Sequence, residues 1–346
     1  MISKKKQIYP INPALRAYLE KYGREVKLPV HYNDVAQYDN AITLYDKEGR
    51  DTLWETVFYP PYLIDEIYRG LKVAYAELKI GGDLSVTRHL TVDRVDVCMY
   101  ANTRPFRVRI VNTINDNFDY FYVKRADASR VYGLELEHIL SPNRISYLSS
   151  GDTLIEEHIA GVPGNQFIRN HLQDKSLNTI RLVKEFVKFN ERCFVRLLGD
   201  MHSSNFVIIA TQDFDEIHYR IRAIDFDQQS YEGKKSVFLP QYFKQNNPII
   251  ELGYQRLRPE SVQQYQQEEK SMIASRLNTT GNRIFALTDI MAADAIAPVE
   301  NVASLRNQLA SHYQNSIFFS CQTMGDIVKE SLRLVLKEVD EHHHYR

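Results

Sequence analysis

Residues 193–229 combine short apolar runs with two polar clusters, and this arrangement restricts the fold of the whole chain. The first cluster, residues 199–205, follows an apolar run. Apolar segments at 206–209 and 217–224, joined by a polar turn, then lead to the second cluster at 225–227. Short apolar runs bounded by turn residues predict a β-hairpin between the clusters. Both clusters therefore lie at strand ends, on one edge of that hairpin.

Three side chains in these clusters carry oxygen atoms suited to chemistry, namely Asp200, Asn205 and Asp225. Carboxylate and amide oxygens are the ligands that Mg²⁺ prefers, and a carboxylate can accept a proton from an attacking hydroxyl. Taken singly, a loop aspartate more often caps a turn. Taken together at one hairpin end, the three residues favour a catalytic interpretation.

Composition excludes several classes of protein. The chain has 346 residues, enough for about two domains, and carries 43 Lys+Arg against 44 Asp+Glu. This balance lacks the strongly basic character of a nucleic-acid binder. No apolar run reaches the ~18 residues of a membrane span, and the N-terminal segment does not resemble a secretory signal. Three scattered cysteines, Cys98, Cys193 and Cys321, predict free thiols in the cytoplasm rather than disulfides or a zinc site.

The middle of the chain alternates apolar and polar residues and predicts an antiparallel sheet with short turns. A helix with Ser129 as its N-cap interrupts these strands, and the GVPG sequence at 161–164 marks a boundary. The predicted strands are 90–101, 106–114, 119–125, 145–148 and 153–158. Helical spacing of apolar residues predicts helices at 61–80, 176–190, 259–276, 302–313 and 322–339.

The sequence GDMHSSN at 199–205, followed by IDFD at 224–227, resembles the paired motifs of the aminoglycoside- and choline-kinase-like phosphotransferases. This family belongs to the protein-kinase-like superfamily, and its pattern is H-G-D-x-H-x-x-N, then a hydrophobic residue, D, F or W, and D, E or G. The resemblance covers about residues 85–235. It implies that Asp200 is the catalytic base and that Asn205 and Asp225 hold Mg²⁺, with His202 as a supporting residue.

The region upstream of the motifs agrees with this resemblance. Family members use a strand lysine that bridges the ATP phosphates to a helix glutamate. Lys124 lies on the third predicted strand, and no other lysine occurs between Lys79 and Lys175. The following helix offers Glu135, which we prefer as the partner, and Glu137 as the alternative.

The resemblance also implies an α+β architecture with the two lobes of a protein-kinase-like fold. A small antiparallel β lobe with one helix and a larger helical lobe would enclose ATP, with the backbone of Glu157 and Ile159 in the hinge strand binding adenine. The corresponding division is an N-terminal helical extension at 1–82, a small ATP-binding lobe at 83–160, and a large helical catalytic and acceptor lobe at 161–346.

The sequence departs from the family pattern at two places. Leu198 occupies the position of the first-motif histidine, and the loop 101–105 between the first two strands contains no glycine. Glycines in that loop let the backbone close over phosphates. These departures keep two alternatives open: a pseudokinase that binds nucleotide or acts as a scaffold, and a nucleotidyl (AMP) transferase. The retained Lys124, Asp200 and Asp225, together with Asn205, favour an active ATP- and Mg²⁺-dependent phosphotransferase.

The acceptor is expected to be a hydroxyl of a small molecule. The segment after the second motif contains Lys234, Lys235 and Lys244. These lysines favour a neutral or anionic acceptor over a cationic one, although a lysine-rich segment is more often simply solvated.

Overall fold

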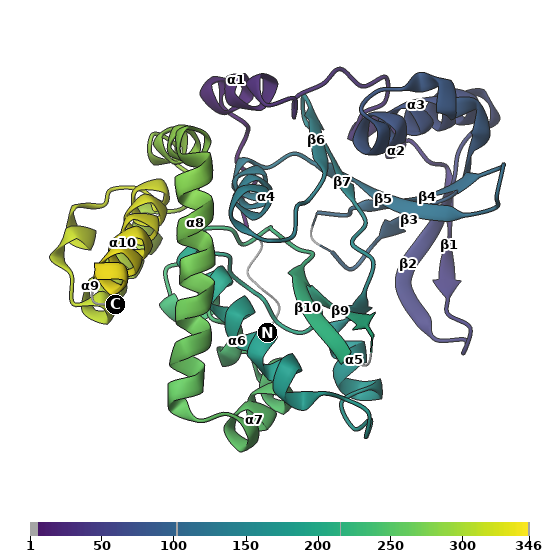
Figure 1. Cartoon of the computed structure of the whole chain (residues 1–346). Coiled ribbons are helices and arrows are strands. Elements are labelled where there is room, and N and C mark those ends of the chain that lie inside the picture. Colours follow the sequence, from purple (N-terminus) through teal and green to yellow (C-terminus); the bar gives the residue numbers. More distant parts are fainter. Residues whose placement is uncertain (1–5, 102, 215, 345–346) are drawn as a thin grey trace. The chain divides into compact units, whose positions relative to one another are not determined.

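The computed structural model describes residues 6–101, 103–214 and 216–344 (Figure 1). The chain divides into two compact units. The first contains the residues up to Ala128 together with Ile145–His158, and the second contains Ser129–Arg144 together with the chain from Ile159 onward. Antiparallel strands dominate the first unit and helices the second, so the predicted α+β class is confirmed.

The first unit is built on a seven-stranded antiparallel sheet with the order β1-β2-β3-β4-β5-β7-β6. The predicted strands and the predicted helix at 61–80 are confirmed. The strands are β1 (Asn40–Tyr45), β2 (Asp51–Phe58), β3 (Leu90–Cys98), β4 (Phe106–Asn112), β5 (Phe118–Arg125), β6 (Tyr147–Ser150) and β7 (Thr153–Glu157). The helices are α1 (Pro13–Lys21), α2 (Tyr32–Val35) and α3 (Pro61–Ile80), with a 3₁₀ turn at Leu84–His89.

One face of this sheet forms the hydrophobic core with α3. Alternate strand residues point to this face, among them Val95, Val108 and Phe121, which are fully buried. Leu71 and Ala74 of α3 belong to the same apolar cluster. Burial of such side chains removes apolar surface from water and is the main stabilising contribution here.

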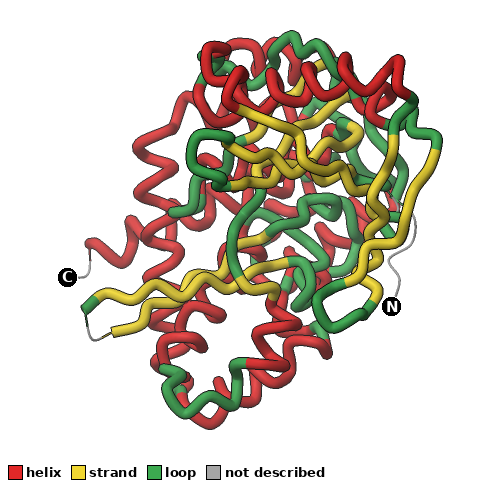
Figure 2. The backbone as a smooth tube through the Cα atoms, turned by 90° about the vertical axis from the view of Figure 1, so that its right-hand side faces the viewer, coloured by secondary structure: helices red, strands yellow, loops and turns green. Residues whose placement is uncertain are grey.

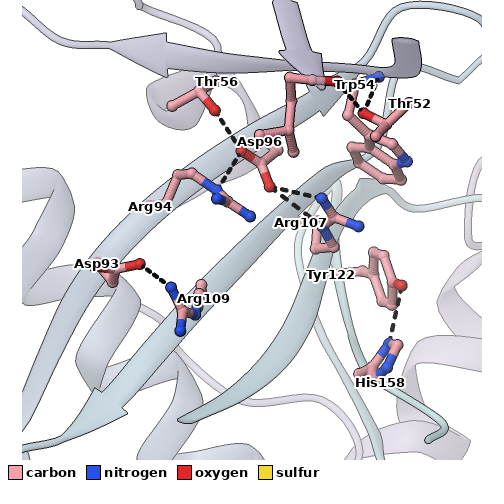
Figure 3. A network of polar contacts seen from close by, with 11 residues as sticks. Thr52, Trp54, Thr56, Asp93, Arg94, Asp96, Arg107, Arg109, Tyr122 and His158 are labelled. Atoms are coloured by element: carbon pink, nitrogen blue, oxygen red, sulfur yellow. Dashed lines mark hydrogen bonds and ion pairs between the residues drawn. The ribbon is translucent and has the colours of Figure 1, made fainter. Parts of the chain in front are cut away.

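The opposite face of the sheet is polar (Figure 3). Register places Thr56, Asp96, Arg107 and Tyr122 side by side in one row across β2 to β5. The carboxylate of Asp96 accepts hydrogen bonds from Thr56 Oγ1 at 2.8 Å and from Arg107 Nη2 at 2.8 Å. The Arg107 guanidinium also lies 4.4 Å from the centre of the Trp54 ring. The buried carboxylate of Asp96 is therefore satisfied by its neighbours on this face.

The second unit contains a small sheet of order β10-β9-β8, together with most of the helices. Figure 2 shows β9 and β10 running side by side as the predicted hairpin. The strands are β8 (Val162–Pro163), β9 (Phe206–Asp213) and β10 (Glu216–Ala223). The helices are α4 (Ala128–Leu140), α5 (Gly164–Asn170), α6 (Thr179–Val195), α7 (Asn247–Arg256), α8 (Pro259–Ala292), α9 (Val299–Tyr313) and α10 (Met324–His344). Helix α8 packs against both α6 and α10.

Three expectations need correction. A purely helical extension at 1–82 is wrong for β1 and β2, which pair with each other and extend the sheet. Apart from the buried Val57, their residues are exposed or half-buried on both faces, so the alternation that identifies a half-buried strand is weak there. Ser129 is not the N-cap of α4, because that helix begins at Ala128. Finally, α4 groups with the second unit rather than with the antiparallel sheet.

Among the residues that the structure describes, no helix combines the length and the hydropathy needed to span a membrane.

Candidate functional site

The β9–β10 hairpin places the two motif clusters at one end, as the sequence predicts. Phe206 pairs with Ala223 at this end of the register. Beyond that pair, the backbone N–H of Ile224 donates to the carbonyl of Asn205 at 3.0 Å. Asn205 and Asp225 therefore lie next to each other on neighbouring chain segments, although twenty residues of sequence separate them.

The first cluster is a tight loop organised around the carbonyl oxygen of Asp200. This carbonyl accepts a hydrogen bond from the backbone of His202 at 2.9 Å and another from Asn205 Nδ2 at 2.8 Å. Asp200 itself has a φ of 60°, in the left-handed region. Because the amide nitrogen of Asn205 is committed to the loop, its Oδ1 atom is the one left to act as a cation ligand.

The second cluster is tied directly to the first. The backbone N–H of Asp227 donates to Asp225 Oδ1 at 3.0 Å. The backbone N–H of Gly199 donates to the carbonyl of Gln228 at 3.1 Å, and Leu198 forms a β-bridge with Gln229. These bonds hold the two motif segments side by side.

Leu198 stands where the motif pattern given above has a histidine. Its side chain is 0% exposed, so an apolar core residue occupies this position. The backbone pairing of Leu198 with Gln229 does not depend on the side chain, and the loop geometry therefore persists without the histidine.

The electrostatic environment of Asp200 favours proton transfer. Burial, followed by the nearby charges of Asp225 and Glu232, raises the pKa of Asp200 to about 6. A carboxyl group with such a pKa can take up and release a proton near neutral pH. Burial also lowers the pKa of His202, whose Nδ1 accepts a hydrogen bond from the backbone N–H of Ser204 at 3.2 Å. The sequence analysis did not identify Glu232.

Lys124 lies on β5 in the first unit and is buried. Its Nζ atom is 2.6 Å from Oε2 of Glu156 on the neighbouring strand β7. Glu156 also stands next to Tyr122 in the cross-strand register, so it extends the polar row on that face. Sequence reasoning missed this glutamate, because the pairing of β5 with β7 is not visible in the sequence.

The two glutamates predicted as partners of Lys124 lie on α4 in the second unit, and both are buried. Glu135 Oε1 accepts a hydrogen bond from Arg283 Nε of α8 at 2.8 Å, and Glu137 forms an ion pair with Arg196. They are therefore not solvated surface residues. The pairing of Lys124 with either of them stays a prediction.

The predicted hinge residues fall at the end of β7. Glu157 Oε1 accepts a hydrogen bond from the backbone of Ser146 at 3.0 Å, and Ile159 is buried. Their backbone contacts with adenine stay a prediction. In the glycine-free loop, Arg104 donates its N–H to the carbonyl of Ala101 at 3.0 Å and has a φ of 43°. Asn102 of the predicted turn lies outside the described residues.

The residues of the site fit a Mg²⁺ ion that is held jointly with phosphates. Across the described ranges, no group of three or more His, Cys, Asp or Glu side chains is placed to hold a metal. Asn205 and Asp225 offer one amide oxygen and one carboxylate. Mg²⁺ in nucleotide sites usually takes one or two protein ligands and completes its shell with phosphate oxygens and water. The donor set suits that arrangement better than a protein-only metal site.

No model of a known protein family matches this chain, and no curated protein matches it either. The kinase-like interpretation therefore depends on the residues and the local geometry described above.

Proposed function

We propose that this protein is an ATP- and Mg²⁺-dependent phosphotransferase with a two-lobed, protein-kinase-like fold, acting on a hydroxyl of a small molecule. The observation that carries the proposal is the hydrogen bond from Asn205 Nδ2 to the Asp200 carbonyl. It occupies the amide nitrogen of Asn205 and leaves Oδ1 as the possible ligand, at the hairpin end that also bears Asp225. One loop thus supplies a base and a ligand, and the neighbouring segment supplies a second ligand.

Each residue has one role in this mechanism. Asn205 Oδ1 and the Asp225 carboxylate hold Mg²⁺, which neutralises charge on the transferred phosphoryl group when bound. Asp200 orients the acceptor hydroxyl and accepts its proton. Lys124, held at its ammonium by Glu156, binds the phosphates. Most of the rate acceleration then comes from positioning and charge neutralisation rather than from covalent chemistry.

The proposal specifies the acceptor only by its chemical class, a small molecule with a hydroxyl group. Lys234 and Lys244 are exposed, whereas Lys235 Nζ contacts His312 Nδ1 at 3.1 Å. Two of the three lysines after the second motif are therefore exposed, as solvated lysines are. The preference for a neutral or anionic small molecule rests on the lysine content of this segment alone. We place the reaction in the cytoplasm, in line with the free thiols of Cys98, Cys193 and Cys321.

The test is thermal unfolding with and without Mg²⁺-ATP, on the wild type, on Asp225→Ala and on Asp213→Ala. Asp213 lies at the far end of the same hairpin, so its replacement is the matched control. Ligand at 100 times its Kd stabilises the native state by about 2.7 kcal/mol, and for a chain of this size that corresponds to roughly 4 °C. We expect this shift in the wild type and the control, and its loss in Asp225→Ala.

Other outcomes separate the alternatives. No shift at millimolar ATP overturns nucleotide binding altogether. A shift that needs no Mg²⁺ and survives in Asp225→Ala supports a pseudokinase. For an active protein, ³¹P NMR of the products distinguishes phosphoryl transfer, which releases ADP, from nucleotidyl transfer, which releases pyrophosphate.

A further inference from the structure

The first turns of α4 lie directly against the segment that follows Asp225. Ser129 Oγ donates a hydrogen bond to the carbonyl of Gln229 at 2.6 Å, and Arg130 forms an ion pair with Asp227. A Cβ atom added to Gly133 would stand 3.0 Å from the Gln229 Cβ and 3.2 Å from the Phe226 Cβ. Three positions of one helix face thus contact the segment 226–229.

This contact reaches the predicted metal ligand through one intermediate. The backbone N–H of Asp227 donates to Oδ1 of Asp225, so the placement of Asp227 determines where that carboxylate oxygen lies. Arg130 is only 2% exposed, whereas the side chain of Asp227 is 29% exposed. The guanidinium is therefore the shielded member of the pair, and removing a charged partner from such a buried group is costly.

The same helix is also tied to the segment that precedes the first cluster. Glu137 pairs with Arg196, and the carbonyl of Arg196 accepts a hydrogen bond from Gln229 Nε2 at 2.5 Å. Helix α4 therefore contacts the segment 226–229 and the chain just before the first cluster. The Arg130–Asp227 pair connects α4 to Asp225 through a single residue.

We propose that Arg130 is a positioning residue for this site: through Asp227 it fixes the Asp225 carboxylate in the orientation that binds the cation. The statement that Asp225 binds a cation rests on the proposed function. The statement that Arg130 fixes the segment 226–229 rests only on the ion pair and the hydrogen bonds described above. Residues that orient a metal ligand typically change metal affinity by about 10- to 100-fold when they are replaced.

Tyr132 provides a matched control on the same helix. Its hydroxyl donates to Asp294 Oδ2 at 3.0 Å, two residues beyond the end of α8. Replacing Tyr132 by Phe removes a polar contact of α4 without touching the residues that contact Asp225. A purely structural role for α4 predicts similar effects for the Tyr132 and Arg130 variants.

The first experiment is hydrogen exchange on the metal-free protein, comparing the wild type with Arg130→Met, Asp227→Asn and Tyr132→Phe. We expect the backbone amides of Asp227, Gln229 and Gly199 to exchange at least about tenfold faster in the first two variants, because opening of this segment becomes easier. The control should leave these amides unchanged. Arg130→Lys retains the charge and serves if Arg130→Met fails to fold. Unchanged exchange in the segment overturns the proposal.

The second experiment is Mn²⁺ binding in the presence of ATP, followed by electron paramagnetic resonance. We expect the Kd for Mn²⁺ to rise about 10- to 100-fold in Arg130→Met and Asp227→Asn and to stay the same in Tyr132→Phe. Faster exchange with unchanged Mn²⁺ affinity also overturns the positioning role. A wild type that binds no Mn²⁺ defeats the proposed function instead, and the exchange result then decides whether Arg130 positions the segment.

Discussion

Two hairpins in this molecule have the same topology and different surroundings. The β9–β10 hairpin begins in a buried position, with Phe206 0% exposed, and its base is fixed to two polar clusters. In the β1–β2 hairpin, Ile42 is 57% exposed, and polar residues occur on both faces. The comparison shows what a hairpin needs in order to hold functional side chains in fixed positions. Its strand ends must be packed and hydrogen-bonded.

The largest expected effect tests the chemistry at the anchored hairpin. Asp200→Asn keeps the size of the side chain and its tolerance of a positive φ, but it removes the proposed proton acceptor. Loss of a general base lowers the rate by about 10²- to 10⁴-fold, as measured by initial rates of ATP-dependent phosphoryl transfer. Asp213→Asn, at the other end of the hairpin, should retain the wild-type rate. A full rate in Asp200→Asn would show that Asp200 is not the base.

The next prediction compares the stability contributed by the two hairpins. Phe206→Ala removes a fully buried ring that lies 5.3 Å from the Phe189 ring of α6, and such a change costs about 3–5 kcal/mol of unfolding free energy. Ile42→Ala, in an exposed position, should change it by about 0.5 kcal/mol or less. Urea denaturation measures both values. Equal effects would contradict the distinction between an anchored and an exposed hairpin.

Helix α6, which packs on β10, makes the free energy of unfolding depend on pH. Burial, only partly offset by Lys270, raises the pKa of Glu191 on α6 to about 7. The folded state therefore holds this proton between pH 4.5 and 7, where the unfolded chain has released it. Stability from this group is present at low pH and is lost as pH rises through that window. Glu191→Gln should remove the loss and raise stability at pH 8 by on the order of 2 kcal/mol, with little change at pH 4, in urea titrations at the two pH values. An identical difference at both pH values would refute it.

The smallest expected effect concerns the turn of the exposed hairpin. Gly49 has a φ of 75° between β1 and β2, and Ala in its place should cost about 1 kcal/mol. Gly281 lies within α8 with no tight neighbour, so Gly281→Ala should instead stabilise by about 0.5–1 kcal/mol. Thermal unfolding of the two variants should shift in opposite directions. A stabilised Gly49→Ala would mean that the turn tolerates another conformation.

The sequence predicts the anchored hairpin because its local patterns agree with its long-range contacts. Asp200, Asn205 and Asp225 come together through one hairpin, and hairpin closure can be inferred from two apolar runs and a turn. The strand that carries Lys124 can likewise be predicted, because the polar Lys124 follows the apolar Val123 in an alternating pattern. These features depend on neighbours within a few residues or across one tight turn.

The remaining features depend on distant contacts that the sequence does not reveal. Glu156 reaches Lys124 only because β7 lies beside β5, and Arg130 reaches Asp227 across about a hundred residues. The β1–β2 hairpin escaped prediction for a different reason, since its side chains are partly solvated on both faces. Alternation of apolar and polar residues identifies a strand only when one of its two faces is buried. Where both faces are largely exposed, the alternation is absent.

The left-handed backbone of Asp200 restricts which residues this position accepts. Asn and Gly adopt that conformation readily, whereas alanine and branched residues resist it. An alanine scan would therefore mix two effects here, refolding of the loop and loss of a carboxylate, and would overstate the chemical role. The same restriction acts on natural variation. Because few residue types tolerate this backbone, substitutions at this position stay limited even where no reaction depends on the side chain. An aspartate retained here in a relative would thus be weaker proof of activity than one retained at Asp225.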